Sequence, residues 1–358
     1  KYIDNYNDSK KVTYHEQTDI SNILKLRAVL KTLPDFCKDY FRAMDPLTTT
    51  KTRISYAYDI RIFFQFLLDE NPAFKDYSMK DFTVDVLDQL KAIDIEEYQE
   101  YLKVYKNGDK TETNGERGLK RKISALRSFY AYYYKHEFIQ TNPTVLVDVP
   151  KTHEKNIIRL DADEVAMLLD HIEHCGDELT GQKRVYYEKT KERDLAIVTL
   201  LLGTGIRVSE CVGLDVEDVD FKNNGIKVTR KGGNEMVVYF GYEVEKALKK
   251  YLEVRKNIVP VAGHEHALFY STQRKRIGIQ AVENLVKKYA GAITTTKKIT
   301  PHKLRSTYGT TLYQETGDIY LVADVLGHRD VNTTKKHYAA MDDARRRKAA
   351  TAVHLRED

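Results

Sequence analysis

The sequence predicts a mainly α-helical protein that carries a small β-sheet in the second of two domains. Apolar residues recur at helical spacing along much of the chain, and residues 225–240 hold two short β-prone runs joined by a glycine-rich turn. The chain has 358 residues, which is too many for one ordinary hydrophobic core.

Composition limits the class of protein. The net charge is only +5 although 31% of the residues are charged, so basic patches can coexist with acidic surface, and the average is weak evidence for a polyanionic partner. Cys37, Cys175 and Cys211 form no C-x-x-C pair, which argues against a disulfide framework or a thiolate zinc site. The polar start KYIDNYNDSKK and the lack of a long apolar run predict a soluble, cytoplasmic protein with no membrane partner.

Residues 20–140 are predicted to be almost all helical. TTTKTRISYAYDIRIFFQFLLDEN begins on threonines that can cap a helix. After a polar loop, KNGDKTETNG, a long helix follows in ERGLKRKISALRSFYAYYYKHEF, and we expect a helical bundle. The apolar residues predicted near one face of the first of these helices are Ile54, Tyr58, Ile60, Phe63, Phe64 and Leu67.

The last helix of this bundle carries basic residues upstream of a run of aromatic residues. In one interpretation the aromatic residues pack in the core and the basic residues form a solvated face. In the other, the basic residues follow the phosphates of a nucleic acid and release its counterions. The basic residues are Arg117, Lys120, Arg121, Lys122 and Arg127.

Residues 138–158 contain two prolines and no helical periodicity, so we interpret them as an interdomain linker with the boundary near residue 152. Beyond them RDLAIVTLLLGTG is apolar nearly all round and predicts a buried helix. GIKVTR and EMVVYF predict a β-hairpin across KGGN. The helical pattern then returns, with HALFY a short possible strand.

The segment TPHKLR predicts a helix that starts with an anion site. Thr300 suits the N-cap and Pro301 the first helical position. His302 and Arg305 are then one turn apart on one face, beside the positive end of the helix dipole. A histidine that only caps or packs is the alternative, because H-x-x-R is common by chance.

Arg207, in LLGTGIRVSECVGL, follows a buried helix and a glycine turn. Its backbone is expected to be held by packing. A guanidinium on such a rigid base is suited to donate two hydrogen bonds to a phosphate or carboxylate. A structural ion pair with Glu210 is the alternative.

Lys231 lies at the hairpin tip, where a lysine is usually solvated but could deliver a proton to a departing alkoxide. His328 follows Gly327, and Tyr338 comes ten residues after His328, on a short helix that Asn332 or Thr333 could cap.

The segments TGIRVSECVGL, RKGGNE, TPHKLR and LGHRDVNTTKKHY resemble the motifs of the tyrosine recombinase (phage integrase) family, especially its Xer and conjugative-transposon integrase branches. The resemblance covers residues 160–345. It implies that Arg207 and Arg305 bind the phosphate, that His302 and His328 form further hydrogen bonds to it, that Lys231 protonates the leaving 5′ oxygen, and that Tyr338 is the nucleophile.

The resemblance extends more loosely to the helical domain. It implies a helical core-binding (SAM-like) domain at residues 35–140 and a tyrosine-recombinase catalytic domain at residues 159–358. Residues 1–34 are then an N-terminal extension and residues 141–158 a linker. Lys51 and Arg53 join the basic helix as expected DNA contacts.

The function implied is that of a site-specific DNA recombinase, which cleaves and rejoins strands through a 3′-phosphotyrosyl intermediate without metal, cofactor or ATP. Four protomers, identical or paired with a related recombinase, would hold two double-stranded DNA sites, and an accessory or directionality protein could assist. The C-terminal helix DDARRRKAATAVHL, or the segment before it, would pack on a neighbouring protomer. Two alternatives are DNA relaxation, as in type IB topoisomerases, and an inactive DNA-binding regulator.

Some positions depart from the commonest family pattern. Ser306 follows Arg305 where many members have a second histidine. The spacing from His328 to Tyr338 is ten residues where many have nine, and His337 occupies the shorter spacing. HEH at residues 264–266 has no third ligand nearby, and we interpret it as part of a loop and not as a metal site.

Overall fold

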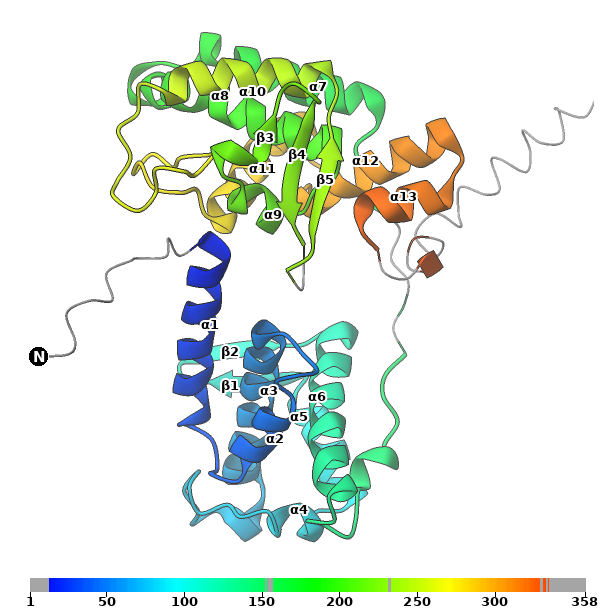
Figure 1. The fold of residues 1–358 in the computed structure, drawn as a ribbon. Coiled ribbons are helices and arrows are strands. Elements are labelled where there is room, and N and C mark those ends of the chain that lie inside the picture. Colours follow the sequence, from blue (N-terminus) through cyan, green and yellow to red (C-terminus); the bar gives the residue numbers. More distant parts are fainter. Residues whose placement is uncertain are drawn as a thin grey trace, which may run out of the picture. The chain divides into compact units, whose positions relative to one another are not determined.

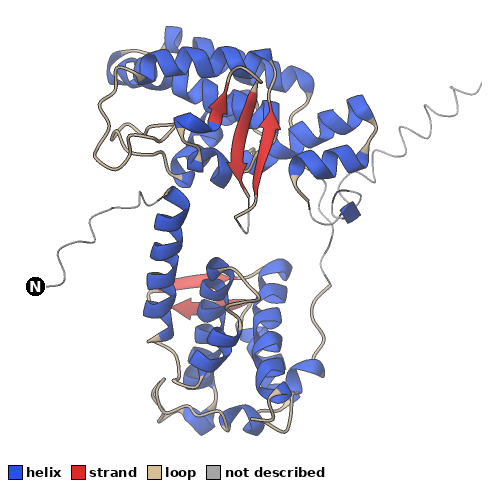
Figure 2. Cartoon of the chain, in the orientation of Figure 1, coloured by secondary structure: helices blue, strands red, loops and turns tan. Residues whose placement is uncertain are grey.

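The computed structural model divides the chain into two compact units, Lys1–Glu154 (unit 1) and Lys155–Asp358 (unit 2). It describes residues 13–151, 153, 157–230, 233–328, 331, 332 and 334. Each unit is mainly helical and contains one small antiparallel sheet, which confirms the predicted fold class (Figures 1 and 2). In the described part of the chain, no helix has the length and apolar character needed to cross a membrane.

Unit 1 is a helical bundle with an aromatic core. The apolar face predicted for its longest helix is confirmed, since Phe63 and Phe64 are fully buried against Phe129 and Tyr130. The elements of unit 1 are α1 (Tyr14–Leu30), α2 (Cys37–Ala43), α3 (Thr50–Glu70), α4 (Val86–Gln89), α5 (Ala92–Tyr101), β1 (Val104–Asn107), β2 (Lys110–Thr113) and α6 (Glu116–Lys135), with 3-10 helices at Pro72–Phe74 and Pro143–Val145.

Unit 1 includes segments that the sequence assigned elsewhere. Helix α1, expected within an N-terminal extension, packs Leu26 and Val29 into the same core. Val147, expected in the linker, is also buried there. The expectation of a polar loop between α5 and α6 was wrong: β1 and β2 pair antiparallel across a turn at Gly108, whose φ is +60°. The Asn-Gly dipeptide is a hairpin signal because this turn favours positive φ.

A buried ion cluster ties α3 to α6. Asp59 on α3 is 2% exposed, and both oxygens of its carboxylate accept hydrogen bonds from Arg121 on α6. The Nζ of Lys122 lies 3.8 Å from the same carboxylate and donates to Asn114, 3.1 Å away. Burial raises the pKa of Asp59 while the charges of Arg121 and Lys122 oppose that shift, and burial lowers the pKa of Lys122. Burying the charges of Asp59 and Lys122 is therefore costly, and each of the two charges needs the other.

Unit 2 is organised around α8. The C-terminal half of α8 is apolar nearly all round and buried, as predicted, and α7, α10 and α12 pack against it. The predicted hairpin is confirmed as β4 and β5, with Gly225 opposite Tyr239 and Thr229 opposite Glu235. The elements of unit 2 are α7 (Ala162–His174), α8 (Gly181–Thr204), α9 (Val208–Gly213), β3 (Val219–Asp220), β4 (Gly225–Thr229), β5 (Glu235–Tyr239), α10 (Tyr242–Arg255), α11 (Ile279–Ile293), α12 (Pro301–Thr316) and α13 (Ile319–Leu326), with 3-10 helices at Cys175–Glu178 and Val216–Asp218.

The short strand expected at HALFY does not form. Ala267 makes only an isolated bridge to Asp215. The carbonyl oxygen of Ala267 accepts hydrogen bonds from the guanidinium of Arg255, 2.8 Å from its Nη2. The Arg255 side chain thus occupies the carbonyl oxygen that a longer β-ladder would need as a hydrogen-bond acceptor.

Replacing Asp59 with asparagine should destabilise unit 1. The substitution keeps the shape of the side chain but leaves the buried ammonium of Lys122 without its counter-charge, so we expect the free energy of unfolding to fall by about 3 kcal/mol. Urea unfolding followed by circular dichroism measures the change. Asp35→Asn is the matched control, because Asp35 pairs with Lys38 and Lys80 on the surface and should matter little. Equal effects of the two substitutions would contradict the importance of the buried cluster.

Candidate active site

Arg207 stands at the N-cap of α9, directly after the buried end of α8. Its Nη1 donates to Oε1 of Glu210 at 2.7 Å, and its backbone N–H donates to Oε2 at 2.8 Å. Glu210 is 5% exposed, whereas 36% of the Arg207 side chain is exposed. The ion pair that the sequence offered as an alternative therefore forms, and it holds a guanidinium that solvent still reaches.

Helix α12 carries the H-x-x-R pair. It begins at Pro301 with Thr300 in the N-cap position, as predicted. His302 is exposed in the first turn, and Arg305, one turn later, is buried. The Arg305 guanidinium donates to the carbonyl oxygens of Gly205 and Leu326. It thus fastens α12 to the end of α8 and to the end of α13.

The end of α13 is where the arginines meet. We call residues 324–328 the α13 turn. Arg305 bonds the carbonyl oxygen of residue 326, and Arg207 approaches that of residue 327, with its Nη2 3.5 Å away. Arg230, the residue after β4, donates to the carbonyl oxygens of residues 325 and 324, at 2.6 Å and 3.4 Å. These carbonyls end a helix and carry partial negative charge, so they are suitable acceptors for three guanidinium groups.

His328 completes the α13 turn and is held from two directions. Its backbone N–H donates to the carbonyl oxygen of Ala323 at 2.9 Å. Its ring Nδ1 lies 2.7 Å from the hydroxyl of Thr334, a side chain that is 0% exposed. This contact fixes the orientation of the imidazole. Thr334 was missed in the sequence, because no motif marks a buried threonine.

The structure therefore brings three of the six expected catalytic residues together. Arg207, Arg305 and His328 surround or form the α13 turn, and His302 lies one helical turn before Arg305. Lys231 and Tyr338 lie outside the described residues, as do Thr333 and the C-terminal helix expected near residues 342–355. Arg230 was also missed, because no feature of the sequence separates it from the other charged residues of the hairpin.

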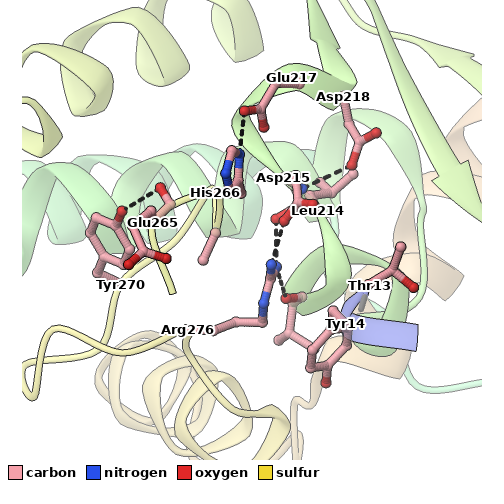
Figure 3. A network of polar contacts seen from close by, with 12 residues as sticks. Thr13, Tyr14, Leu214, Asp215, Glu217, Asp218, Glu265, His266, Tyr270 and Arg276 are labelled. Carbon is pink, nitrogen blue, oxygen red and sulfur yellow. Dashed lines mark hydrogen bonds and ion pairs between the residues drawn. The ribbon is translucent and has the colours of Figure 1, made fainter. Parts of the chain in front are cut away.

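A second arginine network supports α9 from its other end (Figure 3). Arg276 donates to the carbonyl oxygens of Val212 and Leu214, at 3.1 and 2.7 Å, and pairs with the carboxylate of Asp215. It satisfies carbonyls at the C-terminal end of α9 that have no helical partner. The helix that presents Arg207 is therefore anchored at both ends.

The HEH segment contributes to the same region as a loop. His266 pairs through Nδ1 with the carboxylate of Glu217. Among the residues that the structure describes, no group of three histidine, cysteine or acidic side chains is placed to hold a metal ion.

The seven basic residues expected to bind DNA in unit 1 divide into two groups. Four are engaged within the unit. Arg53 pairs with Asp45, Arg121 and Lys122 belong to the Asp59 cluster, and Arg127 bonds the carbonyl oxygens of residues 144 and 147. The other three, Lys51, Arg117 and Lys120, are exposed.

Sequence comparison relates the chain to known proteins. A model of the phage integrase family matches residues 158–345. Tyrosine recombinase XerC of Caldanaerobacter subterraneus subsp. tengcongensis is 33% identical over 315 residues, which are 85% of this chain and 82% of the relative. Tyrosine recombinase XerS of Lactococcus lactis subsp. cremoris is 31% identical over 338 residues, which cover 88% of this chain and 93% of the relative.

Solved structures share the fold. A pre-cleavage complex of XerH site-specific recombinase bound to difH substrate matches with a TM-score of 0.61 and 21% identity, covering 85% of this chain and 79% of that one. The Tn1549 transposon integrase in complex with circular intermediate DNA matches with a TM-score of 0.60 and 21% identity, over 84% of this chain and 94% of that one. A lambda integrase dimer bound to a core site matches with a TM-score of 0.59 and 17% identity, over 85% and 94%.

Replacing Thr334 with valine should release the ring of His328. Valine keeps the volume of threonine but lacks the hydroxyl, so we expect the free energy of unfolding to fall by about 1 kcal/mol. The ¹⁵N shifts of the His328 ring should also move, because Nδ1 loses its partner. Thr334→Ser, which keeps a hydroxyl, should preserve the ring shifts. Unchanged shifts in the valine variant would show that the contact does not orient the ring.

Proposed function

The chain belongs to the phage integrase family and is a site-specific tyrosine recombinase, and we propose that the residues around the α13 turn bind the phosphate at which it cleaves and rejoins DNA. The observation that carries this proposal is the convergence of Arg207, Arg305 and His328 at one turn of unit 2. Guanidinium groups are permanently charged and fork onto phosphate oxygens. A phosphodiester bound at the α13 turn would therefore have its negative charge stabilised by Arg207 and Arg305.

The arginines and histidines stabilise the charge that develops on the phosphate. Arg207 and Arg305 bind its non-bridging oxygens, and His302 and His328 add hydrogen bonds. Such fixed donors typically contribute a factor of about 10² to 10³ each, because they need not reorganise during the reaction. The guanidinium groups thereby take the part that a metal ion plays in other phosphoryl transfer enzymes.

Tyr338 and Lys231 carry the bond-making and bond-breaking steps. The phenolic oxygen of Tyr338 attacks phosphorus in line, losing its proton, while the bond between phosphorus and the 5′ oxygen breaks. Lys231 protonates the departing 5′ oxygen. The product is a 3′-phosphotyrosyl diester and a free 5′-hydroxyl. A 5′-hydroxyl of another strand then loses its proton and attacks this diester. The bond between phosphorus and Tyr338 breaks and the phenolic oxygen regains a proton, so the phosphodiester bond is restored without ATP.

The substrate that fits this chemistry is a double-stranded DNA recombination site. Solved relatives are complexes with difH substrate, circular intermediate DNA and a core site. By analogy, we infer that protomers of this chain, alone or with a related recombinase, assemble as a tetramer on two such sites. The exposed Lys51, Arg117 and Lys120 are available to bind the DNA backbone. We propose that the protein acts in the cytoplasm. We also propose that residues 159–358 form its catalytic domain.

Replacing Tyr338 with phenylalanine should abolish covalent attachment to DNA, because the variant lacks the attacking oxygen. A nicked suicide substrate that carries the recombination site on which the protein acts should trap the wild-type protein as a phosphotyrosyl adduct on a denaturing gel. The His337→Phe variant is the control for the neighbouring position and should retain the adduct. An adduct that survives Tyr338→Phe, or its absence in the wild-type protein, would refute the assignment. Efficient relaxation of a plasmid without the site would instead favour a topoisomerase.

Replacing Lys231 with alanine should slow cleavage by about 10² to 10⁴-fold, the usual contribution of a general acid. A substrate with sulfur in place of the 5′ bridging oxygen should restore the rate, because a thiol pKa of about 8.5 lets the leaving group depart without a proton. Lys227→Ala alters an exposed lysine of the same hairpin, which pairs with Glu235, and should cleave normally. If sulfur does not rescue Lys231→Ala, the lysine has another role.

A further inference from the structure

Arg230 is the third guanidinium at the α13 turn, and it has no place in the chemistry described so far. Its backbone N–H donates to the carbonyl oxygen of Asn234 at 2.8 Å, and its carbonyl oxygen accepts from the backbone N–H of Gly233 at 3.0 Å. These two bonds close the end of the β4–β5 hairpin. The side chain therefore projects from a backbone with little freedom.

The side chain of Arg230 fastens the hairpin to the α13 turn. Besides its bonds to the carbonyl oxygens of Asp324 and Val325, its guanidinium lies close to Gly327, with Nη1 nearest. A Cβ on Gly327 would be 1.5 Å from Nη1 of Arg230, and the φ of this glycine is +63°. Glycine is therefore favoured at residue 327 by its positive φ, and a larger residue would also displace the Arg230 guanidinium.

The surroundings of Arg230 are unfavourable to a cation. Burial lowers its pKa, the nearby positive charge of Arg207 adds to this, and Glu210 opposes it. Its Nε is buried and has no hydrogen-bond partner among the described residues. These costs reduce the net stability that the contacts of Arg230 provide, so their main effect is to position the α13 turn.

We propose that Arg230 is a positioning residue for strand cleavage, which holds the α13 turn, and with it His328, at the spacing from Arg207 and Arg305 that one phosphate requires. The proposal rests on the function proposed above. Arg230 acts through the turn and not on the DNA. Its loss should let the turn and the hairpin separate while the arginines that bind phosphate remain.

The test compares DNA binding with cleavage in three variants. Arg230→Ala should bind site DNA within about twofold of wild type but cleave a suicide substrate about 10 to 100-fold more slowly, since a misplacement of about 1 Å can have this effect. Arg230→Lys, which keeps the positive charge but lacks the planar fork of the guanidinium, should lie between. Arg255→Ala is the matched control, because Arg255 is also half-buried and bonds loop carbonyls in unit 2, far along the chain from the turn. It should cleave within about twofold of wild type.

The outcomes separate this inference from the function on which it rests. If wild type forms no adduct, the proposed function fails. If wild type forms the adduct and Arg230→Ala matches its rate, only the inference fails. A parallel loss of binding would make Arg230 a DNA contact, and rescue by the 5′ sulfur substrate would make it part of proton delivery; either result overturns the proposal. An equal loss of cleavage rate in Arg255→Ala would also overturn the proposal. If Arg230→Ala does not fold, the lysine variant decides by the same criteria.

Discussion

The candidate site of unit 2 depends on hydrogen bonds from three arginines to the carbonyl oxygens at the end of α13. Arg305 reaches them from α12, Arg207 from the N-cap of α9, and Arg230 from the hairpin. Three elements far apart in the sequence are therefore tied to one turn. The last carbonyl oxygens of a helix have no partner within the helix. In unit 2 these oxygens accept hydrogen bonds from the arginines and so bring the cationic groups together.

The same arrangement prepares the site electrostatically before any substrate binds. Three like charges within one region repel each other, and the structure offsets this with helix-end carbonyls and the buried carboxylate of Glu210. In the function proposed above, a phosphate that binds at the α13 turn meets hydrogen-bond donors and positive charges that are already in place, which is how preorganised sites lower reaction barriers.

The basic residues of the chain show that charge alone does not identify a DNA contact. Arg121 and Lys122 lie within one turn of Arg117 and Lys120 on α6, yet they bind the buried Asp59. Arg127 serves as a clamp for the carbonyls of residues 144 and 147, which keeps the start of the expected linker on unit 1. The core packing expected for the aromatic residues of this helix is confirmed for Phe129, Tyr130 and Tyr133, which are buried. DNA binding by the exposed Arg117 and Lys120 stays a prediction.

By itself the sequence determined the fold class, the aromatic face of α3, the hairpin of unit 2 and the start of α12, because periodicity, turn chemistry and capping are local properties. It also ordered Arg207, Lys231, His302, Arg305, His328 and Tyr338 as one set, through spacing that resembles a family. The β1–β2 hairpin could have been predicted from its Asn-Gly turn. Only the tertiary structure decided that Glu210 pairs with Arg207, that Thr334 holds His328 and that Arg230 joins the α13 turn. The Arg207–Glu210 pair has helical i,i+3 spacing, so the sequence could offer it as an alternative but could not decide whether it forms. The contacts of Thr334 and Arg230 carry no periodic signal along the chain, so they follow from packing.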